Sequence, residues 1–188
     1  LCAERIRAAG ITVRSYRAAT ADDPSFLEGN AIGPEVRTPI ATVLYRCNTD
    51  SDNLYAECLL KRLGRAASKS PGSWANGTAA LRHAVAERLS NPALAGSINP
   101  DDGSGLSREN RVTASAITAW LDSFAKDPEL GPTYLESMAI GGKTGTVKKR
   151  FKDIERTGYL VQCKTGYIRG VSCLSGFITA PDGRRMSF

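Results

Sequence analysis

With 188 residues, the chain has the length of one domain or of a large piece of one, and its 41% hydrophobic content is enough for an ordinary core. This composition argues against a disordered chain, and no apolar run approaches the roughly 20 residues that a membrane-spanning helix needs. The formal net charge of +6 favours acidic partners, whether nucleic acid, an anionic envelope polymer or carboxylate-bearing substrates.

The first residues predict a helix followed by a short strand. Residues 1–13 read as an amphipathic helix that ends at Gly10 and then as a β-branched strand, because glycine tolerates the left-handed conformation after a helix. The chain begins at Leu1 without an initiator methionine or a leader, so we expect a mature form or a fragment. Residues 18–37 predict a long surface loop, since prolines and glycines recur there, at Pro24, Gly29, Gly33 and Pro34.

Two predicted helices flank the tripeptide Ser51-Asp52-Asn53. A threonine N-cap followed by proline predicts a helix that starts at 38–39 and runs to about residue 47. Polar residues 48–53 interrupt the 3.6-residue helical pattern of apolar side chains. This pattern resumes over 54–63 and ends at Gly64. The tripeptide is therefore expected at a turn between two helices.

The middle of the chain alternates helices and loops. Residues 78–89 predict a helix, and Thr113 predicts the cap of another helix that extends to about Ala125 before Pro128. The Gly-, Asp- and Ser-rich stretch 97–111 predicts a loop, and residues 127–157 show no regular period.

The end of the chain changes to short β-rich runs. GYLVQCKTGYI, SCLSGFITA and RRMSF are separated by the turn sequences RGV and PDG, which predicts an antiparallel meander over about 158–188. The part that precedes it, about 38–140, is helix-rich. Helices followed by a terminal sheet indicate the α+β class rather than alternating βαβ units.

Cysteine and histidine usage gives no sign of a metal centre or of another bound cofactor. The five cysteines lie far apart without a CxxC pair, and His83 is the single histidine. We therefore expect no structural metal and no cofactor. We also expect the cysteines to be small core residues without a disulfide, and their odd number leaves at least one thiol free. They are Cys2, Cys47, Cys58, Cys163 and Cys173.

The tripeptide Lys-Thr-Gly occurs twice, at 143–145 and at 164–166. In enzymes that acylate a serine, this tripeptide opposite a Ser-x-Asn holds a substrate carboxylate and helps to pass a proton. The first copy lies in a predicted loop. The second lies in a predicted strand, whose edge can pair with an extended peptide, and Gly166 lets such a substrate approach closely. We therefore predict that the second copy is the functional one.

Four stretches of the chain resemble the penicillin-binding serine D-alanyl-D-alanine carboxypeptidases, specifically the class C low-molecular-weight group that also acts as endopeptidase on peptidoglycan cross-links. The stretches match that group in order and spacing, and they are 48–64, 102–114, 145–151 and 163–178. In the family, the region of the first Lys-Thr-Gly carries Gly-Thr-Leu followed shortly by arginine, matched here by Gly145, Thr146, Val147 and Arg150. The resemblance thus implies that Lys143 is not catalytic.

The resemblance also implies a partial penicillin-binding, β-lactamase-like transpeptidase fold, in which residues 1–188 are the C-terminal part of the peptidase domain. The implied substrates are peptidoglycan stem peptides ending in D-Ala-D-Ala, and β-lactam antibiotics would be covalent inhibitors of the complete enzyme. The implied location is periplasmic or otherwise extracytoplasmic.

Carried over by motif, the family's roles fall on five positions. Ser51 would relay a proton between the catalytic lysine and the leaving amine, and Asn53 would bind the substrate's peptide amide. Lys164 would supply positive charge and Thr165 would bind the terminal carboxylate of D-alanine. The backbone N–H of Tyr167 would help to form the oxyanion hole. The family more often has serine or threonine where Tyr167 stands, so its ring is expected to narrow the pocket.

The nucleophile and general base of the family belong to a Ser-x-x-Lys motif that precedes Ser-x-Asn. The one such pattern in this chain is Ser123–Lys126, which follows Ser51 and lies in a predicted helix, so we interpret it as structural. The resemblance therefore implies the C-terminal part of the enzyme, with the nucleophile before Leu1 and a last strand and helix after Phe188. Such a piece is expected neither to acylate nor to hydrolyse by itself.

Three other functions remain open on the sequence. A class A β-lactamase shares Ser-Asp-Asn and Lys-Thr-Gly, but residues 87–91 read ERLSN in a predicted helix rather than the Glu-x-x-Leu-Asn of its deacylation loop. A catalytically inactive peptidoglycan-binding module is distinguished by the absence of an upstream Ser-x-x-Lys. A nucleic-acid-binding domain is suggested by the basic residues 148–152, yet no nucleic-acid-binding motif accompanies them, so no nucleic-acid partner is expected.

Overall fold

The computed structural model describes residues 2–17, 20 and 37–188, and the chain divides into two compact units at residues 35–36. In the first unit, helix α1 (Cys2–Ala8) is followed by Gly10 at φ +80°, as predicted. No strand forms among the described residues of this unit, so the strand expected after Gly10 was wrong. Most of the loop predicted over 18–37 falls outside the described residues.

The second unit begins with two helices on either side of the Ser51 turn. Helix α2 (Ile40–Asn48) has Pro39 as its N-cap without a side-chain hydrogen bond, so the cap predicted at Thr38 is wrong by one position. Helix α3 (Asn53–Ser68) is capped by Asp52, whose carboxylate accepts the backbone N–H groups of Leu54 and Tyr55. The predicted turn between two helices is confirmed.

Helix α3 does not end at Gly64, contrary to the prediction. Gly64 is buried where α3 meets helix α4 (Trp74–Leu89), and a Cβ there would lie 2.2 Å from Asn76 Oδ1 and 2.6 Å from Gly77 N. Glycine at this position therefore permits the close approach of two helices. Helix α4 also starts four residues earlier than predicted, because Ser73 and Asn76 form a reciprocal capping box.

Residues 92–157 contain more regular secondary structure than the sequence indicated. Thr113 caps helix α6 as predicted, since its Oγ1 accepts the N–H of Ala116. The stretch 127–157, expected to be irregular, contains a short helix, a short strand and two turns of 3₁₀ helix. Before this stretch lie α5 (Pro92–Gly96) and α6 (Ala114–Ala125). Within it lie α7 (Gly131–Glu136), β1 (Ala139–Ile140), η1 (Gly145–Val147) and η2 (Ile154–Thr157).

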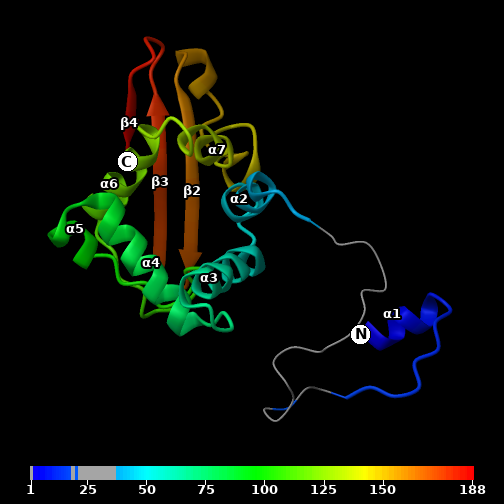
Figure 1. Cartoon of the computed structure of the whole chain (residues 1–188). Helices are drawn as coiled ribbons and strands as arrows, with labels where there is room; N and C mark the ends of the chain where they lie inside the picture. Colours follow the sequence, from blue (N-terminus) through cyan, green and yellow to red (C-terminus); the bar gives the residue numbers. More distant parts are fainter. Residues whose placement is uncertain (1, 18–19, 21–36) are drawn as a thin grey trace. The chain divides into compact units, whose positions relative to one another are not determined.

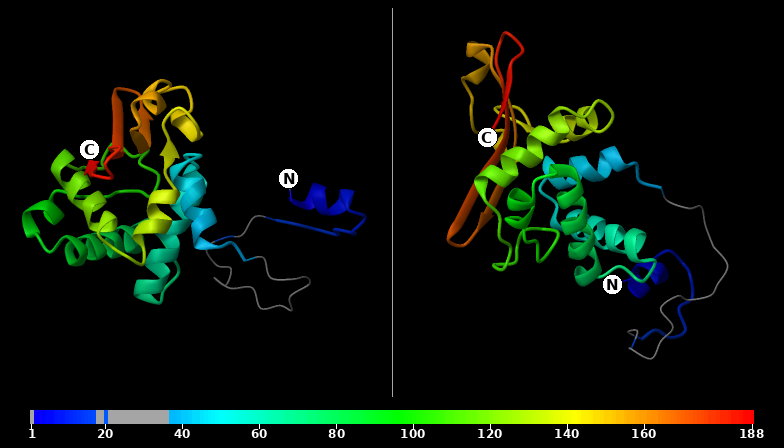
Figure 2. Two further views of the ribbon diagram at one scale, coloured as in Figure 1. Left: turned by 90° about the horizontal axis from the view of Figure 1, so that it is seen from above. Right: turned by 60° about the vertical axis from the view of Figure 1, so that its left-hand side comes forward.

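The predicted meander is confirmed. Strands β2 (Leu160–Ile168), β3 (Val171–Thr179) and β4 (Arg185–Ser187) form an antiparallel sheet in the order β1-β2-β3-β4. Helices α3 to α6 gather on one face of this sheet (Figures 1 and 2). The chain therefore has the α+β architecture that the sequence predicted.

Two apolar clusters stabilise the sheet from opposite faces. On the helical face, Phe177 of β3 is 1% exposed and packs with Leu121 of α6 and Met138. On the other face, Val161 and Cys163 of β2 pack with residues of β1 and η1. Since neighbouring residues of a strand point to opposite faces, β3 contributes to both clusters, with Phe177 in the first and Ile178 against the second.

The four cysteines of the second unit are free thiols, but their expected burial holds for only some of them. Cys163 is fully buried and Cys47 is half-buried, whereas Cys58 and Cys173 are exposed. The expectation that all cysteines are core residues is therefore wrong for these two. Within the described ranges, no helix combines the length and the apolar character needed to cross a membrane.

Candidate active site

The turn between α2 and α3 presents Ser51 in an unusual backbone conformation. Ser51 has φ +59°, in the left-handed region that non-glycine residues rarely adopt. The preceding residues are fixed to the end of α7, because Thr49 Oγ1 donates to the Ser137 carbonyl at 2.6 Å and Asn48 Nδ2 donates to Ser137 Oγ at 2.8 Å. The Asp52 cap fixes the other end of the turn, so the Ser51 side chain has a defined position.

Lys164 of β2 reaches this turn. Its Nζ donates a hydrogen bond of 2.8 Å to Ser51 Oγ and a second one to the Thr165 carbonyl. The side chain is half-buried, and this burial lowers the pKa of Lys164, while the nearby Cys47 and Cys163 act in the opposite direction. The ammonium therefore lies between the helical turn and the strand, in an environment that weakens its hold on the proton.

Among the described residues, no strand pairs with the edge of β2 next to this lysine. Strand β1 pairs only with Gln162 and Cys163, and the N–H of Gly141 donates to the Val161 carbonyl at 2.9 Å. In an antiparallel ladder, the backbone groups of alternate residues point to the same neighbour. The backbone groups of Thr165 and Tyr167 consequently point to the same edge as those of Val161, beyond the end of β1, where no described strand pairs with them.

The second Lys-Thr-Gly becomes more exposed along the strand, from its half-buried lysine to its exposed glycine. Thr165 is half-buried, Gly166 is exposed, and the Tyr167 side chain is 80% exposed. A Cβ on Gly166 would meet only Cys173 Cβ, at 3.5 Å, so the space around this glycine is uncrowded. Asn53, the first residue of α3, is also exposed. The structure thus joins Ser51, Lys164 and Thr165 by direct contacts and leaves Asn53 and Tyr167 accessible beside them.

Thr146 belongs to the same group of residues, although the sequence did not single it out as a site residue. Thr165 Oγ1 donates to Thr146 Oγ1 at 2.8 Å. The adjacent Gly145 has φ +55°, and a Cβ there would lie 2.3 Å from the Thr49 carbonyl, so η1 packs directly against the Ser51 turn. The one signal in the sequence was the match of Gly145-Thr146-Val147 to a family segment, which carried no assigned role.

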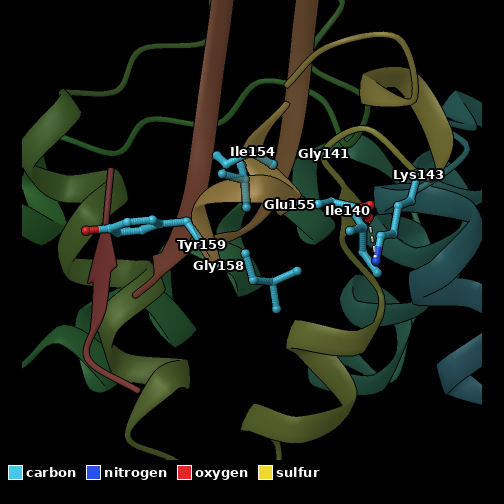
Figure 3. A pocket seen from close by; sticks show the side chains of 9 residues that line it. Ile140, Gly141, Lys143, Ile154, Glu155, Gly158 and Tyr159 are labelled. Atoms are coloured by element: carbon cyan, nitrogen blue, oxygen red, sulfur yellow. Dashed lines mark ion pairs between the residues drawn. The ribbon is translucent and has the colours of Figure 1, made fainter. Parts of the chain in front are cut away.

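Lys143, the lysine of the first Lys-Thr-Gly, has its partner outside this site. Lys143 forms an ion pair of 2.7 Å with Glu155 across a pocket between β1, η2 and the start of β2 (Figure 3). Figure 3 also shows Ile140, Ile154 and Tyr159 around this pocket, which contains neither Ser51 nor Lys164. Lys143 is accordingly a surface residue that links two segments of its own loop.

The Ser123-x-x-Lys126 pattern also lies apart from the site. Ser123 Oγ donates to the Trp120 carbonyl at 2.6 Å within α6 and accepts a hydrogen bond of 2.7 Å from Arg88 Nε. Arg88 also forms an ion pair of 2.9 Å with Asp127. The Ser123 hydroxyl is therefore engaged in joining α4 to α6.

Comparison with known proteins places the chain in one family. Residues 2–188 match the model of the D-Ala-D-Ala carboxypeptidase 3 (S13) family. The D-alanyl-D-alanine carboxypeptidase of Actinomadura sp. (strain R39) is 27% identical over 185 residues, which are 96% of this chain and 33% of that protein. The D-alanyl-D-alanine carboxypeptidase DacB of Haemophilus influenzae is 30% identical over 167 residues, which are 86% of this chain and 33% of the relative.

Solved structures agree with this match. The crystal structure of penicillin binding protein 4 (dacB) from Haemophilus influenzae superposes with a TM-score of 0.69 and 29% identity, over 79% of this chain and 32% of that one. Its complex with a novel β-lactam gives a TM-score of 0.77 at 25% identity, over 99% of this chain and 42% of the other. The chain spans about a third of the length of these curated relatives. It has part of the penicillin-binding protein fold, and it belongs to the D-Ala-D-Ala carboxypeptidase 3 (S13) family.

Proposed function

We propose that the Ser51 turn and the Lys164 edge form two walls of the active site of a serine D-Ala-D-Ala carboxypeptidase, acting in the complete protein. The observation that carries this proposal is the hydrogen bond of 2.8 Å from Lys164 Nζ to Ser51 Oγ. It brings a cation and a hydroxyl together beside a strand edge that can accept an extended peptide. Acyl transfer needs this combination, because a proton must reach the leaving amine while an oxyanion develops.

Each candidate residue then has a role that its position supports. Ser51 relays the proton to the leaving amine and Lys164 supplies positive charge to the pocket. Asn53, exposed at the start of α3, binds the substrate's peptide amide. Thr165 binds the terminal carboxylate, Tyr167 contributes its backbone N–H to the oxyanion hole, and Gly166 leaves room for the substrate backbone.

The nucleophile comes from another part of the complete protein. Residues 1–188 supply the C-terminal part of the peptidase domain, with the Ser-x-Asn wall from about 38–140 and the Lys-Thr-Gly wall from about 158–188. A Ser-x-x-Lys motif elsewhere in the complete protein forms the acyl-enzyme with peptidoglycan stem peptides or with penicillins. The same proposal places the protein outside the cytoplasmic membrane, where peptidoglycan is built.

The test is to treat the complete protein with a fluorescent penicillin and, separately, with a tripeptide that ends in D-Ala-D-Ala. The proposal predicts a covalent label that persists under denaturing conditions and the release of free D-alanine. Reversible binding of muropeptides without covalent label would instead indicate an inactive peptidoglycan-binding module. Rapid turnover of penicillin without release of D-alanine would indicate a β-lactamase.

A further inference from the structure

Tyr167 is the most exposed large hydrophobic side chain of the described residues, and it stands on the free edge of β2. Strands β2 and β3 pair without interruption from Leu160↔Thr179 to Ile168↔Val171, so the alternation of side chains is regular along the whole hairpin. The side chains of Thr165 and Tyr167 therefore lie on the same face, about 7 Å apart. Leu174, directly across from Thr165 in β3, shares this face and is 37% exposed.

This face combines hydroxyl groups with apolar surface. Thr165 and Thr146 share a hydrogen bond of 2.8 Å, and because hydroxyl protons rotate, Thr146 can become the donor of this bond while Thr165 donates its own proton to an anion. Beside the two hydroxyls, the ring of Tyr167 and the side chain of Leu174 offer apolar area that the protein itself leaves uncovered. An exposed aromatic ring next to a polar anchoring point is typical of a residue that contacts a ligand.

We infer that Tyr167 is a specificity-determining residue, whose ring contacts the side chain of the leaving D-amino acid. The inference rests on the proposed function, in which the Thr165 hydroxyl holds the terminal carboxylate. With the carboxylate there, the side chain of the same terminal residue lies within reach of the ring, two positions along the strand. A terminal residue with an apolar side chain then buries ring surface on binding, whereas terminal glycine does not.

The contact makes leaving-group selectivity depend on the ring and not on the tyrosine backbone. Tyr167→Ser removes the ring but keeps the N–H that faces the free edge, so the proposed oxyanion contact survives. Tyr167→Phe keeps the ring and removes only the phenol. Tyr159→Ser is the matched control, since Tyr159 is a partly exposed tyrosine that lines the pocket of Figure 3 instead.

The test measures kcat/KM of the complete protein for three tripeptides with the same acyl half and terminal D-alanine, D-leucine or glycine. We expect the ratio of D-leucine to glycine to fall about tenfold in Tyr167→Ser, because a small apolar contact contributes roughly that much selectivity. The ratio should stay unchanged in Tyr167→Phe and in Tyr159→Ser. Since the acyl-enzyme is the same for all three peptides, the ratio reports the leaving-group site alone.

Two results would overturn the inference while leaving the proposed function intact. An unchanged ratio in Tyr167→Ser would show that the ring does not touch the leaving group. An increased ratio would show that the ring excludes large leaving groups instead of binding them. Failure of the unmodified protein to hydrolyse any of the three peptides would defeat the proposed function, and this inference with it.

Discussion

Lys164 donates a hydrogen bond of 2.8 Å to Ser51, although 113 positions separate the two residues in the chain. The bond joins the turn between two helices to the edge of a sheet that forms only near the end of the chain. The cation, the hydroxyl and the open strand edge meet at this junction.

Ser51 combines a left-handed backbone with a functional hydroxyl, and two substitutions separate these properties. Both Ser51→Ala and Ser51→Gly remove the hydroxyl, so the acylation rate of the complete protein should fall about 10²- to 10⁴-fold in each. Glycine adopts φ +59° without strain, so Ser51→Gly should be more stable than Ser51→Ala by about 1 kcal/mol. Penicillin acylation kinetics and urea unfolding measure the two effects. Equal stability of the two variants would contradict the strain at this position.

Asp52 stabilises the start of α3 through two backbone hydrogen bonds, of 3.0 Å and 3.2 Å. Asp52→Ala should lower the free energy of unfolding by about 1 kcal/mol, whereas Asp52→Asn keeps an acceptor oxygen and should cost little. Because the cap also fixes the Ser51 turn, the alanine variant should acylate more slowly than the asparagine variant. Urea unfolding of both variants checks the prediction, which fails if the asparagine variant is as unstable as the alanine variant.

Gly145 permits the contact between η1 and the Ser51 turn. Gly145→Ala adds a Cβ that would lie 2.3 Å from the Thr49 carbonyl, in addition to the cost of φ +55°, so we expect a loss of about 3 kcal/mol of stability. Gly170→Ala is the control, because Gly170 has φ +84° but nothing within 4 Å of the added Cβ. That control should lose only about 1 kcal/mol. Similar losses in both variants, measured by urea unfolding, would show that packing against Thr49 is unimportant.

The charge of Lys164 should set the alkaline limit of acylation. Burial lowers its pKa, so the ammonium loses its proton at a lower pH than the usual lysine value of about 10.4. The penicillin acylation rate should therefore be at its maximum at neutral pH, where Lys164 is protonated. The rate should decline as the pH rises through this lowered pKa. A guanidinium stays protonated, so in Lys164→Arg the remaining activity should lose this alkaline limb. An identical limb in both proteins would assign the titration to another group.

Local chemistry accounts for the parts of the fold that the sequence predicted. The cap at Thr113, the turn around Ser51 and the alternating strands of the meander depend on residues close together in the chain. The strand context of the second Lys-Thr-Gly also follows from this alternation. These features were predicted because neighbouring residues specify them.

The features that the sequence missed depend on contacts between distant segments. Gly64 looked like a helix end, but it lies within α3 because α4 packs against it. Cys58 and Cys173 are exposed although they lie within a regular helix and a regular strand, and composition cannot reveal this. Thr146 joins the site only because η1 folds back against the Ser51 turn, 19 positions from Thr165 in the sequence.

The two Lys-Thr-Gly copies supply the most direct test of the whole account. Lys164→Ala and Lys143→Ala make the same chemical change, one at the hydrogen bond to Ser51 and the other at a surface ion pair with Glu155. The measurement is the rate of covalent labelling of the complete protein by a fluorescent penicillin. We expect Lys164→Ala to abolish labelling and Lys143→Ala to label at the unmodified rate. Equal loss in both variants, or normal labelling of Lys164→Ala, would contradict the assignment of the active site to the second copy.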